Sequence, residues 1–257
     1  MKDYNKPKII ELKKVSKVYC HDKIDLLALK EVTFDVYEGE VLSIVGPSGC
    51  GKSTLLKMIS GLLPVTDGSI LFRGSYVDGV QDNIAIVFQN PVLLEWRSVF
   101  DNVMLPVEIF KLDPKEYQNK VFELLKLAGL QGFEKKYPWQ LSGGMQQRVS
   151  LVRALISNPS VLLMDEPFGA LDAITRENLS YELLNIWEKT KKTIIFVTHD
   201  ISEAVFLGDR VIILTSRPGS VAKIIEVDLD RPRTPEMRIN PKHTEIAHKI
   251  YKIISMN

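Results

Sequence analysis

The chain has 257 residues, 45% of them hydrophobic and 25% charged, which is enough material for one large α/β domain with its own core. Lys and Arg number 33 against 32 for Asp and Glu, and this balance excludes the strongly basic character of many nucleic-acid-binding domains. The two cysteines exclude a secreted disulfide scaffold, and the longest apolar stretches are too short to cross a bilayer.

Short runs rich in β-branched residues indicate strands in the first third of the chain. They are Ile9–Leu12, Val32–Val36, Glu40–Val45, Ser69–Phe72 and Ile84–Phe88. The third run leads directly into a glycine-rich loop. Ser53–Ser60 follows this loop and is expected to be a helix, because its apolar residues fall on one side.

The character of the sequence changes between residues 90 and 158. Lys115–Ala128 carries apolar residues at helical spacing, with charged residues elsewhere on the helix. Gly143–Ser157 is a second expected helix, for which Ser142 is the candidate N-cap. We interpret this segment as a helical insertion between strands.

After the insertion, strands and helices alternate again, as in an α/β fold. The expected strands are Val161–Met164, Thr193–Thr198 and Arg210–Leu214, and the expected helices are Arg176–Thr190 and Ile201–Leu207. The end of the chain, from residue 216 to 257, is interpreted as a peripheral extension with a short helix near Glu245–Ile254.

The loop after the third strand fits the phosphate-binding pattern G-x-x-x-x-G-K-[ST]. A strand, glycines and a helix N-terminus place several backbone N–H groups around one point, which suits a phosphate. Lys52 adds positive charge for the β and γ phosphates, and Ser53 offers a hydroxyl to Mg²⁺. The alternative is a chance glycine-rich turn, which the flanking strand and helix disfavour. The predicted nucleotide-binding residues of this P-loop are Gly46, Pro47, Ser48, Gly49, Cys50, Gly51, Lys52, Ser53 and Thr54.

Two acidic residues, Asp165 and Glu166, stand at the end of a wholly apolar strand. Charges at the carboxyl end of a parallel strand point into the usual ligand crevice of such sheets. Asp165 would hold Mg²⁺ and Glu166 would polarise an attacking water. A structural Asp at a strand end is the alternative, but it does not explain two acids in succession followed by Pro167.

Leu141–Gly144 opens the second helix of the insertion and therefore offers another anion site. By itself, Ser-Gly-Gly is a common helix start. Its position between the P-loop and the two acids favours a functional role.

These motifs, together with Val197–Asp200, resemble those of the ATP-binding subunits of ABC transporters, and the resemblance covers about residues 8–235. It implies a P-loop NTPase (ABC ATPase) core with an antiparallel β-subdomain and an inserted helical subdomain. The core with its β-subdomain would take about residues 1–89 and 159–215, the helical subdomain 90–158, and a C-terminal extension 216–257.

The resemblance also implies roles for single residues. Tyr19 would stack on adenine, Gln89 would contact Mg²⁺ or water, and His199 would lie near the γ-phosphate. Asp172 would communicate across a dimer. Taken singly, each residue is more often structural. The implied catalytic residues are Lys52, Gln89, Glu166 and His199, and the implied metal ligands are Ser53, Gln89 and Asp165.

The resemblance further implies a head-to-tail homodimer in the ATP-bound state. Ser142, Gly143 and Gly144 of one protomer would close over ATP bound to the other. ATP and Mg²⁺ are the expected cofactors. The expected partners are an integral-membrane permease and, indirectly, a solute-binding protein, with no nucleic acid. The chain would then lie at the cytoplasmic face of the cell membrane.

A closer similarity is to the branch of importers for nitrate, sulfonates and taurine, which also includes transporters for bicarbonate and thiamine-pyrimidine precursors. It is carried by the segments Asp165–Arg176, Phe196–Leu207, Arg217–Gly219 and Arg231–Arg233. One departure is Glu95, where the branch usually has Pro. This position belongs to the surface expected to meet the permease, so it weakens any assignment of the solute.

Two other functions remain open from the sequence. A soluble ABC ATPase acting on nucleic acid or ribosomes usually has a long coiled-coil insertion or two ATPase halves, whereas this chain has one P-loop and no long heptad tract. An exporter ATPase is often fused to its membrane domain, and this chain has no spanning segment.

Overall fold

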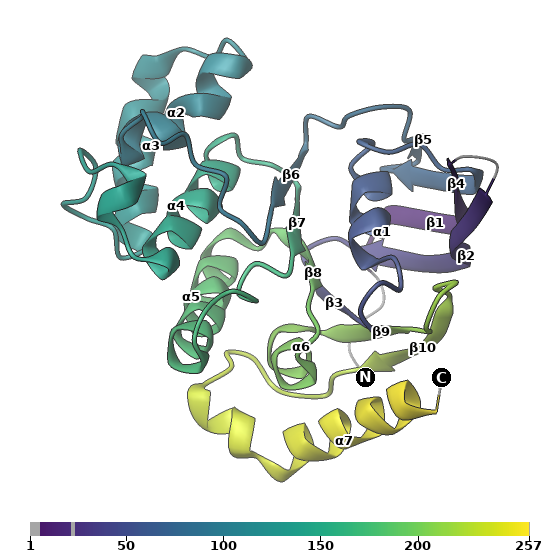
Figure 1. Cartoon of the computed structure of the whole chain (residues 1–257). Helices are drawn as coiled ribbons and strands as arrows, with labels where there is room; N and C mark the ends of the chain where they lie inside the picture. Colours follow the sequence, from purple (N-terminus) through teal and green to yellow (C-terminus); the bar gives the residue numbers. More distant parts are fainter. Residues whose placement is uncertain (1–5, 22–23, 257) are drawn as a thin grey trace. The chain divides into compact units, whose positions relative to one another are not determined.

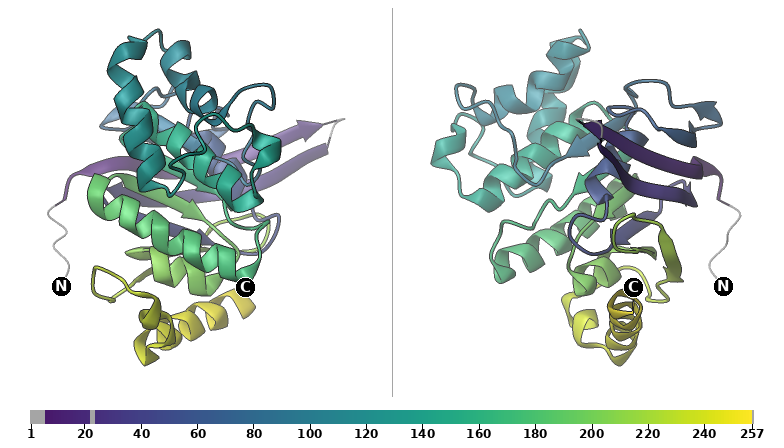
Figure 2. Two further views of the ribbon diagram at one scale, coloured as in Figure 1. Left: turned by 90° about the vertical axis from the view of Figure 1, so that its left-hand side faces the viewer. Right: turned by 45° about the vertical axis from the view of Figure 1, so that its right-hand side comes forward.

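The computed structural model describes residues 6–21 and 24–256, which form two units (Figure 1, Figure 2). The first unit comprises the described residues up to 82 together with those from 191 onward, and the second comprises residues 83–190. The predicted α/β organisation, with an antiparallel sheet and a helical insertion, is confirmed. The finer subdomain boundaries stay a prediction.

An antiparallel sheet of the first unit has the order β2-β1-β4-β5. Its strands are β1 (Lys8–His21), β2 (Ile24–Tyr37), β4 (Asp67–Phe72) and β5 (Ser75–Tyr76). The strands β1 and β2 are much longer than the sequence predicted. The β1–β2 register shifts between Leu12 and Val15, and Lys14 and Glu31 have positive φ values of 49° and 46°. These bulges interrupt the alternation of apolar and polar residues, so the sequence pattern breaks before the strand does.

The first unit also contains strands in the order β10-β9-β3-β8. They are β3 (Val41–Val45), β8 (Thr193–Val197), β9 (Arg210–Leu214) and β10 (Val221–Glu226). The strand β3 pairs in parallel with both β8 and β9, and every residue of β3 and β8 is buried. Such burial on both faces explains their continuous apolar sequences. The antiparallel strand β10 was not predicted.

The helices of the first unit are α1 (Lys52–Ile59), α6 (Ile201–Leu207) and α7 (Pro241–Ser255), with a 3₁₀ helix η2 (Pro235–Ile239). The bounds of α6 and β9 agree with the sequence prediction. The helix α7 starts four residues before the predicted helix, because Asn240 caps it by accepting from Lys242 N and Pro241 suits the first position.

The second unit pairs β6 (Ile84–Val87) with β7 (Val161–Asp165) in parallel. Its helices are α2 (Val99–Ile109), α3 (Pro114–Leu127), η1 (Pro138–Gln140), α4 (Gly143–Ile156) and α5 (Ala173–Thr190). A buried cluster that includes Val103, Val121 and Val149 joins α2, α3 and α4. No helix among the described residues is both long and apolar enough to cross a membrane.

The sequence patterns did not predict the helix α2. Pro106 stands inside it, which is a poor sign for a helix interior. The signal that could have revealed it is Ser98, whose hydroxyl accepts a hydrogen bond from Asp101 N at 3.1 Å and so caps the first turn.

Candidate functional site

The P-loop connects β3 to α1 in the first unit, and its glycines are required by close packing. Gly51 has a φ of 101°, and a Cβ there would come within 2.7 Å of a methyl carbon of Leu29. A Cβ on Gly46 would lie 2.9 Å from the Cys50 sulfur and 3.0 Å from the Leu214 carbonyl oxygen. A side chain at either position would therefore displace the loop.

The start of α1 has the features of a phosphate site. Its N-cap residue is Gly51, which has no side chain with which to cap the first turn. The buried Lys52 donates to the carbonyl oxygens of Gly46 at 3.0 Å and Pro47 at 3.1 Å, which holds its ammonium against the loop. An uncapped helix N-terminus with a lysine at hand fits a phosphate well.

Tyr19 lies beside the end of the P-loop. Its hydroxyl oxygen is 3.1 Å from Oγ1 of Thr54, and its side chain is 37% exposed. The ammonium of Lys17 lies 5.5 Å from the ring centre. The ring therefore has an accessible surface next to the phosphate site, which suits an aromatic platform for a base.

His199 lies at the same edge of the sheet as the P-loop. The parallel register pairs Ile44 with Val197, and Thr198 N donates to Ile44 O at 3.2 Å. Because parallel strands end together, the residue after β8 comes close to the loop after β3. The side chain of His199 is exposed.

The two acids and Gln89 gather at one edge of the second unit. The parallel register pairs Val87 with Met164, so both strands end at the same level. Glu166 has a φ of 46°, an uncommon value for a residue with a side chain, and Gly169 N donates to its carbonyl oxygen at 3.0 Å. A Cβ on Gly169 would lie 3.1 Å from Nε2 of Gln89. Residues held in this region of φ also occur at turns and bulges, and they are enriched at functional sites.

The start of α4 is exposed at Ser142 and Gly143 and tightly packed at Gly144. The Ser142 hydroxyl accepts from Met145 N at 3.3 Å and caps the helix. A Cβ on Gly144 would come within 2.9 Å of the Thr175 methyl carbon, so the segment lies against the first turn of α5.

Asp172 caps this first turn of α5. Its Oδ1 accepts a hydrogen bond from Thr175 N at 3.0 Å. The same backbone bond holds the pKa of Asp172 below its usual value. The carboxylate is exposed and ionised, and it stands next to the start of α4 in the second unit.

The structure thus groups the predicted site residues within each unit. Tyr19, the P-loop and His199 lie together in the first unit, and Gln89, the two acids, Ser142–Gly144 and Asp172 belong to the second. Within the described residues no three side chains of His, Cys, Asp or Glu gather as a metal site. Of the donors predicted for Mg²⁺, the Ser53 hydroxyl belongs to the first unit, and the Gln89 amide and the Asp165 carboxylate belong to the second. All three are oxygen donors, the kind that Mg²⁺ takes together with phosphate and water. The role of each residue stays a prediction.

Arg217 was noted in the sequence only for its resemblance, yet it contacts the P-loop. Its Nε and Nη2 both donate to the carbonyl oxygen of Gly49 at 3.3 Å. Two residues later, a Cβ on Gly219 would meet the Cys50 carbonyl oxygen at 2.0 Å. The loop between β9 and β10 therefore supports the P-loop from outside, which no local sequence pattern reveals.

Comparison with known proteins gives a consistent result. A sequence model described as ABC transporter matches residues 29–169. The aliphatic sulfonates import ATP-binding protein SsuB of Bacillus thuringiensis subsp. konkukian is 43% identical over 87% of this chain and 88% of its own length. The taurine import ATP-binding protein TauB of Rhizobium johnstonii is 44% identical over 88% of each chain. A dimeric, post-hydrolysis structure of an ATP-binding cassette bound to ADP and Pi is 36% identical with a TM-score of 0.74, covering 86% of this chain and 100% of that chain.

Proposed function

The chain belongs to the ABC transporter family and is an ATP-hydrolysing, ATP-binding subunit, and from this premise we propose that it powers the import of a small sulfonate or taurine-like anion through a separate membrane permease. The observation that carries the proposal is the 43–44% identity to sulfonate and taurine import subunits over 87–88% of this chain. Nitrate, bicarbonate and thiamine-pyrimidine precursors are the other solutes to be tested.

The first unit would bind the nucleotide. The uncapped start of α1 would hold the β and γ phosphates, with Lys52 turning from its own loop carbonyls toward the phosphate charge. Tyr19 would stack on the adenine, and His199 would hydrogen-bond near the γ-phosphate. The exposure of Tyr19 and the parallel register that places His199 beside the P-loop support these roles.

The second unit would supply the hydrolytic groups. Mg²⁺, when bound, would neutralise charge that develops on the phosphates. Of the residues assigned to hold it, Gln89 and Asp165 belong to this unit and Ser53 belongs to the first. Glu166 would orient a water and accept its proton, and its place directly after β7, at the carboxyl end of a parallel strand, supports this role.

The exposed start of α4 would act on a second protomer. Ser142 and Gly143 present a capped helix N-terminus to solvent, and Asp172 lies beside it through the Gly144–Thr175 contact. We assign these groups to an ATP-bound homodimer, in which Ser142–Gly144 of one copy contact the nucleotide of the other.

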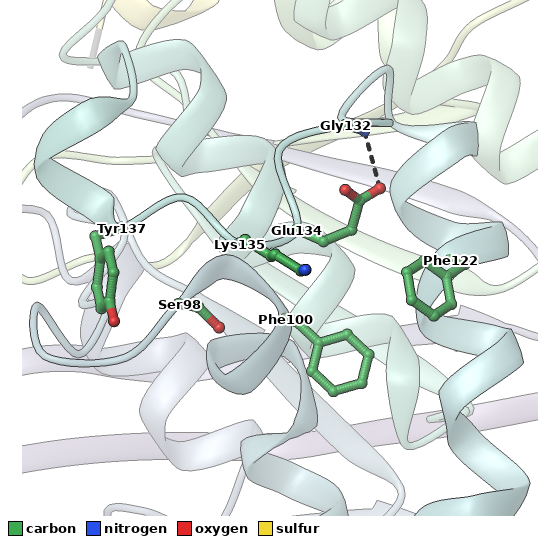
Figure 3. Close-up of a pocket in the computed structure, with 7 residues that line it drawn as sticks. All are labelled: Ser98, Phe100, Phe122, Gly132, Glu134, Lys135 and Tyr137. Atoms are coloured by element: carbon green, nitrogen blue, oxygen red, sulfur yellow. Dashed lines mark hydrogen bonds between the residues drawn. The ribbon is translucent and has the colours of Figure 1, made fainter.

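The permease would dock on the second unit near the start of α2. Trp96 is 74% exposed just before this helix, whereas Leu93 packs on the helical core. Ser98, two residues after Trp96, lines a cavity of about 540 Å³. Figure 3 shows the rings of Phe100, Phe122 and Tyr137 among its lining residues. A short apolar helix of the permease would fit this surface, at the cytoplasmic face of the membrane, with a solute-binding protein acting on the other side.

A transport assay tests the proposal. Cells that lack the native gene are complemented with the wild-type chain or with Glu166→Gln, and uptake of labelled taurine and an aliphatic sulfonate is measured. We expect uptake only with the wild type, and competition by the unlabelled solute. Taurine and sulfonate uptake by the wild-type strain no higher than in cells without the gene would contradict the proposed solute class, and uptake of labelled nitrate or bicarbonate would reassign it. Equal uptake by the wild type and Glu166→Gln would contradict the role of Glu166.

A second measurement tests the docking surface. Trp96→Ala should keep the ATPase activity of the isolated subunit but reduce transport by the assembled complex. Tyr76→Ala, at an equally exposed tyrosine of β5, is the control and should transport normally. Loss of folding in Trp96→Ala, with normal transport per folded complex, would instead mean that Trp96 serves folding and not docking.

A further inference from the structure

The segment that contains Arg231–Arg233 holds the C-terminal end of α6, next to α7 (Figure 1). The side chain of Arg233 is fully buried, and its Nη1 donates to the carbonyl oxygens of Val205 at 3.0 Å and Phe206 at 2.6 Å. The last carbonyls of a helix have no partner within it, and cations are favoured there. Arg233 therefore closes the end of α6.

Arg231 connects the same end of α6 to the strand β3 through Asp209. Its Nη2 donates to the carbonyl oxygen of Leu207 at 2.8 Å, and its Nε donates to Asp209 at 3.0 Å. The other oxygen of Asp209 accepts from Val41 N at 3.0 Å, at the beginning of β3. The end of α6 is thus fixed to the strand that leads into the P-loop.

His243, on α7, holds the other end of α6. The residue is 3% exposed, and its Nε2 lies 3.1 Å from the carbonyl oxygen of Ser202. Because a carbonyl oxygen can only accept, Nε2 donates. Burial lowers the pKa of His243, so the ring donates as a neutral imidazole. Between the two ends, the Arg238 guanidinium stacks 4.0 Å from the Phe206 ring centre.

The first turn of α6 in turn fixes the residues on both sides of His199. The hydroxyl of Thr198 donates to the buried carboxylate of Glu203 at 2.5 Å. Asp200 caps α6 by accepting from Glu203 N at 3.0 Å, and its own N–H donates to Thr198. Any displacement of α6 therefore moves the backbone that carries His199.

Apolar packing follows the same path. Ile250 of α7 belongs to one buried cluster with Ala204 and Val205 of α6 and with Val45, the residue before the P-loop. Polar and apolar contacts thus run from the C-terminal segment through α6 to the residues that flank His199.

We propose that the C-terminal segment from Arg231 to His243 is a positioning element for His199, acting through α6. Arg231, Arg233 and His243 do not touch the nucleotide in this proposal; they set the direction of α6 and hence of the His199 ring. The proposal rests on the proposed role of His199 in hydrolysis. It assigns the two arginines of the Arg231–Arg233 motif a positioning role.

The test compares four variants of the full chain. His243→Leu cannot donate to Ser202, whereas His243→Gln keeps a donor at a similar place. Arg233→Lys keeps the charge but loses the planar guanidinium that carries Nη1, the nitrogen that donates to both carbonyls. Lys242→Ala removes the exposed ion pair with Asp228 on the same segment and is the matched control.

We expect kcat for ATP to fall about 10- to 100-fold in His243→Leu and Arg233→Lys, with KM unchanged, because misplacing a catalytic group by about 1 Å has effects of this size. His243→Gln should recover most of the rate, and Lys242→Ala should match the wild type. The ring resonance of His199 in the ¹H–¹³C spectrum, assigned with His199→Ala, should shift or broaden in the two slow variants only.

The outcomes separate the two hypotheses. A fully active His199→Ala removes the proposed role of His199, while a shifted His199 resonance in His243→Leu still supports the positioning contact. Conversely, if His199→Ala is inactive but His243→Leu and Arg233→Lys keep a normal kcat and an unshifted resonance, the segment only adds stability and the positioning proposal is wrong. If His243→Leu does not fold, Arg233→Lys decides in the same way.

Discussion

The starts of α1 and α4 are both glycine-rich, but they are built in opposite ways. At α1 no side chain caps the helix, the following Lys52 is buried against its own loop, and the glycines press on neighbouring backbone and side chains. At α4 the Ser142 hydroxyl caps the helix, and Ser142 and Gly143 face solvent.

This difference suggests a division of labour. An uncapped, rigid helix start keeps its N–H groups for a ligand held inside its own unit. A capped, exposed start is stable without a ligand. Its shape does not depend on the nucleotide of its own copy, which suits a contact with a second copy. We therefore propose that the start of α1 binds nucleotide within its own unit and that the start of α4 contacts a second copy.

The largest effect is expected for Glu166→Gln, which leaves both helix starts intact but removes the proposed base. ATP turnover should fall by about 10²–10⁴-fold, while ATP binding persists. With ATP present, the variant should elute as a dimer in gel filtration, because the closed state is not resolved by hydrolysis. A variant that stays monomeric at high concentration would break the assignment of α4 to a second copy. Glu177→Gln, exposed on α5, is the control.

Lys52→Ala tests the start of α1. Removing the ammonium from the loop should lower ATP turnover by at least about 10²-fold, the usual consequence of losing one preorganised charge stabiliser. Lys57→Ala, which removes an exposed lysine of the same helix, should have no effect. Steady-state turnover of Lys52→Ala close to that of the wild type would show that the loop needs no such charge.

Tyr19→Ala tests whether the nucleotide at the start of α1 also stacks its base on an aromatic ring. If the exposed ring stacks on the base, ATP affinity should weaken by about 1–3 kcal/mol, as measured for base–aromatic stacking elsewhere. Because every base has a π-face, GTP should compete with ATP in the wild type. Titration calorimetry measures both effects, and an unchanged affinity in the variant would remove Tyr19 from the site.

The smallest effect is expected for Ser142→Ala, which tests the capped start. Loss of the cap should reduce the free energy of unfolding by about 1 kcal/mol in thermal or denaturant unfolding without nucleotide. Ser142→Asp restores an acceptor and should recover stability, yet its carboxylate should still oppose ATP-driven dimerisation. If both variants dimerise normally with ATP, Ser142 caps the helix and does nothing more.

Much of this architecture follows from local sequence patterns. The bounds of α6 and β9 were predicted to the residue, and the P-loop was placed between its strand and helix. In these regions burial, periodicity and turn chemistry all favour the same structure.

The misses occur where a local rule is overridden or a distant contact decides. Pro106 hid α2, and the positive φ of Lys14 hid the full length of β1. The contact between Arg217 and Gly49, which was not predicted, joins positions 168 residues apart. Pattern analysis reads neighbours along the chain, so it cannot supply such pairs.

The approach of Gly219 to the P-loop restricts how the sequence can drift. At this position any side chain would collide with the Cys50 carbonyl oxygen, since even a Cβ would lie only 2.0 Å away. A substitution there is therefore tolerable only if the P-loop backbone shifts as well, and that loop is fixed by its own glycines. In evolutionary terms, the P-loop and the loop around Gly219, which are separated in the sequence by the helical insertion, each limit the substitutions open to the other.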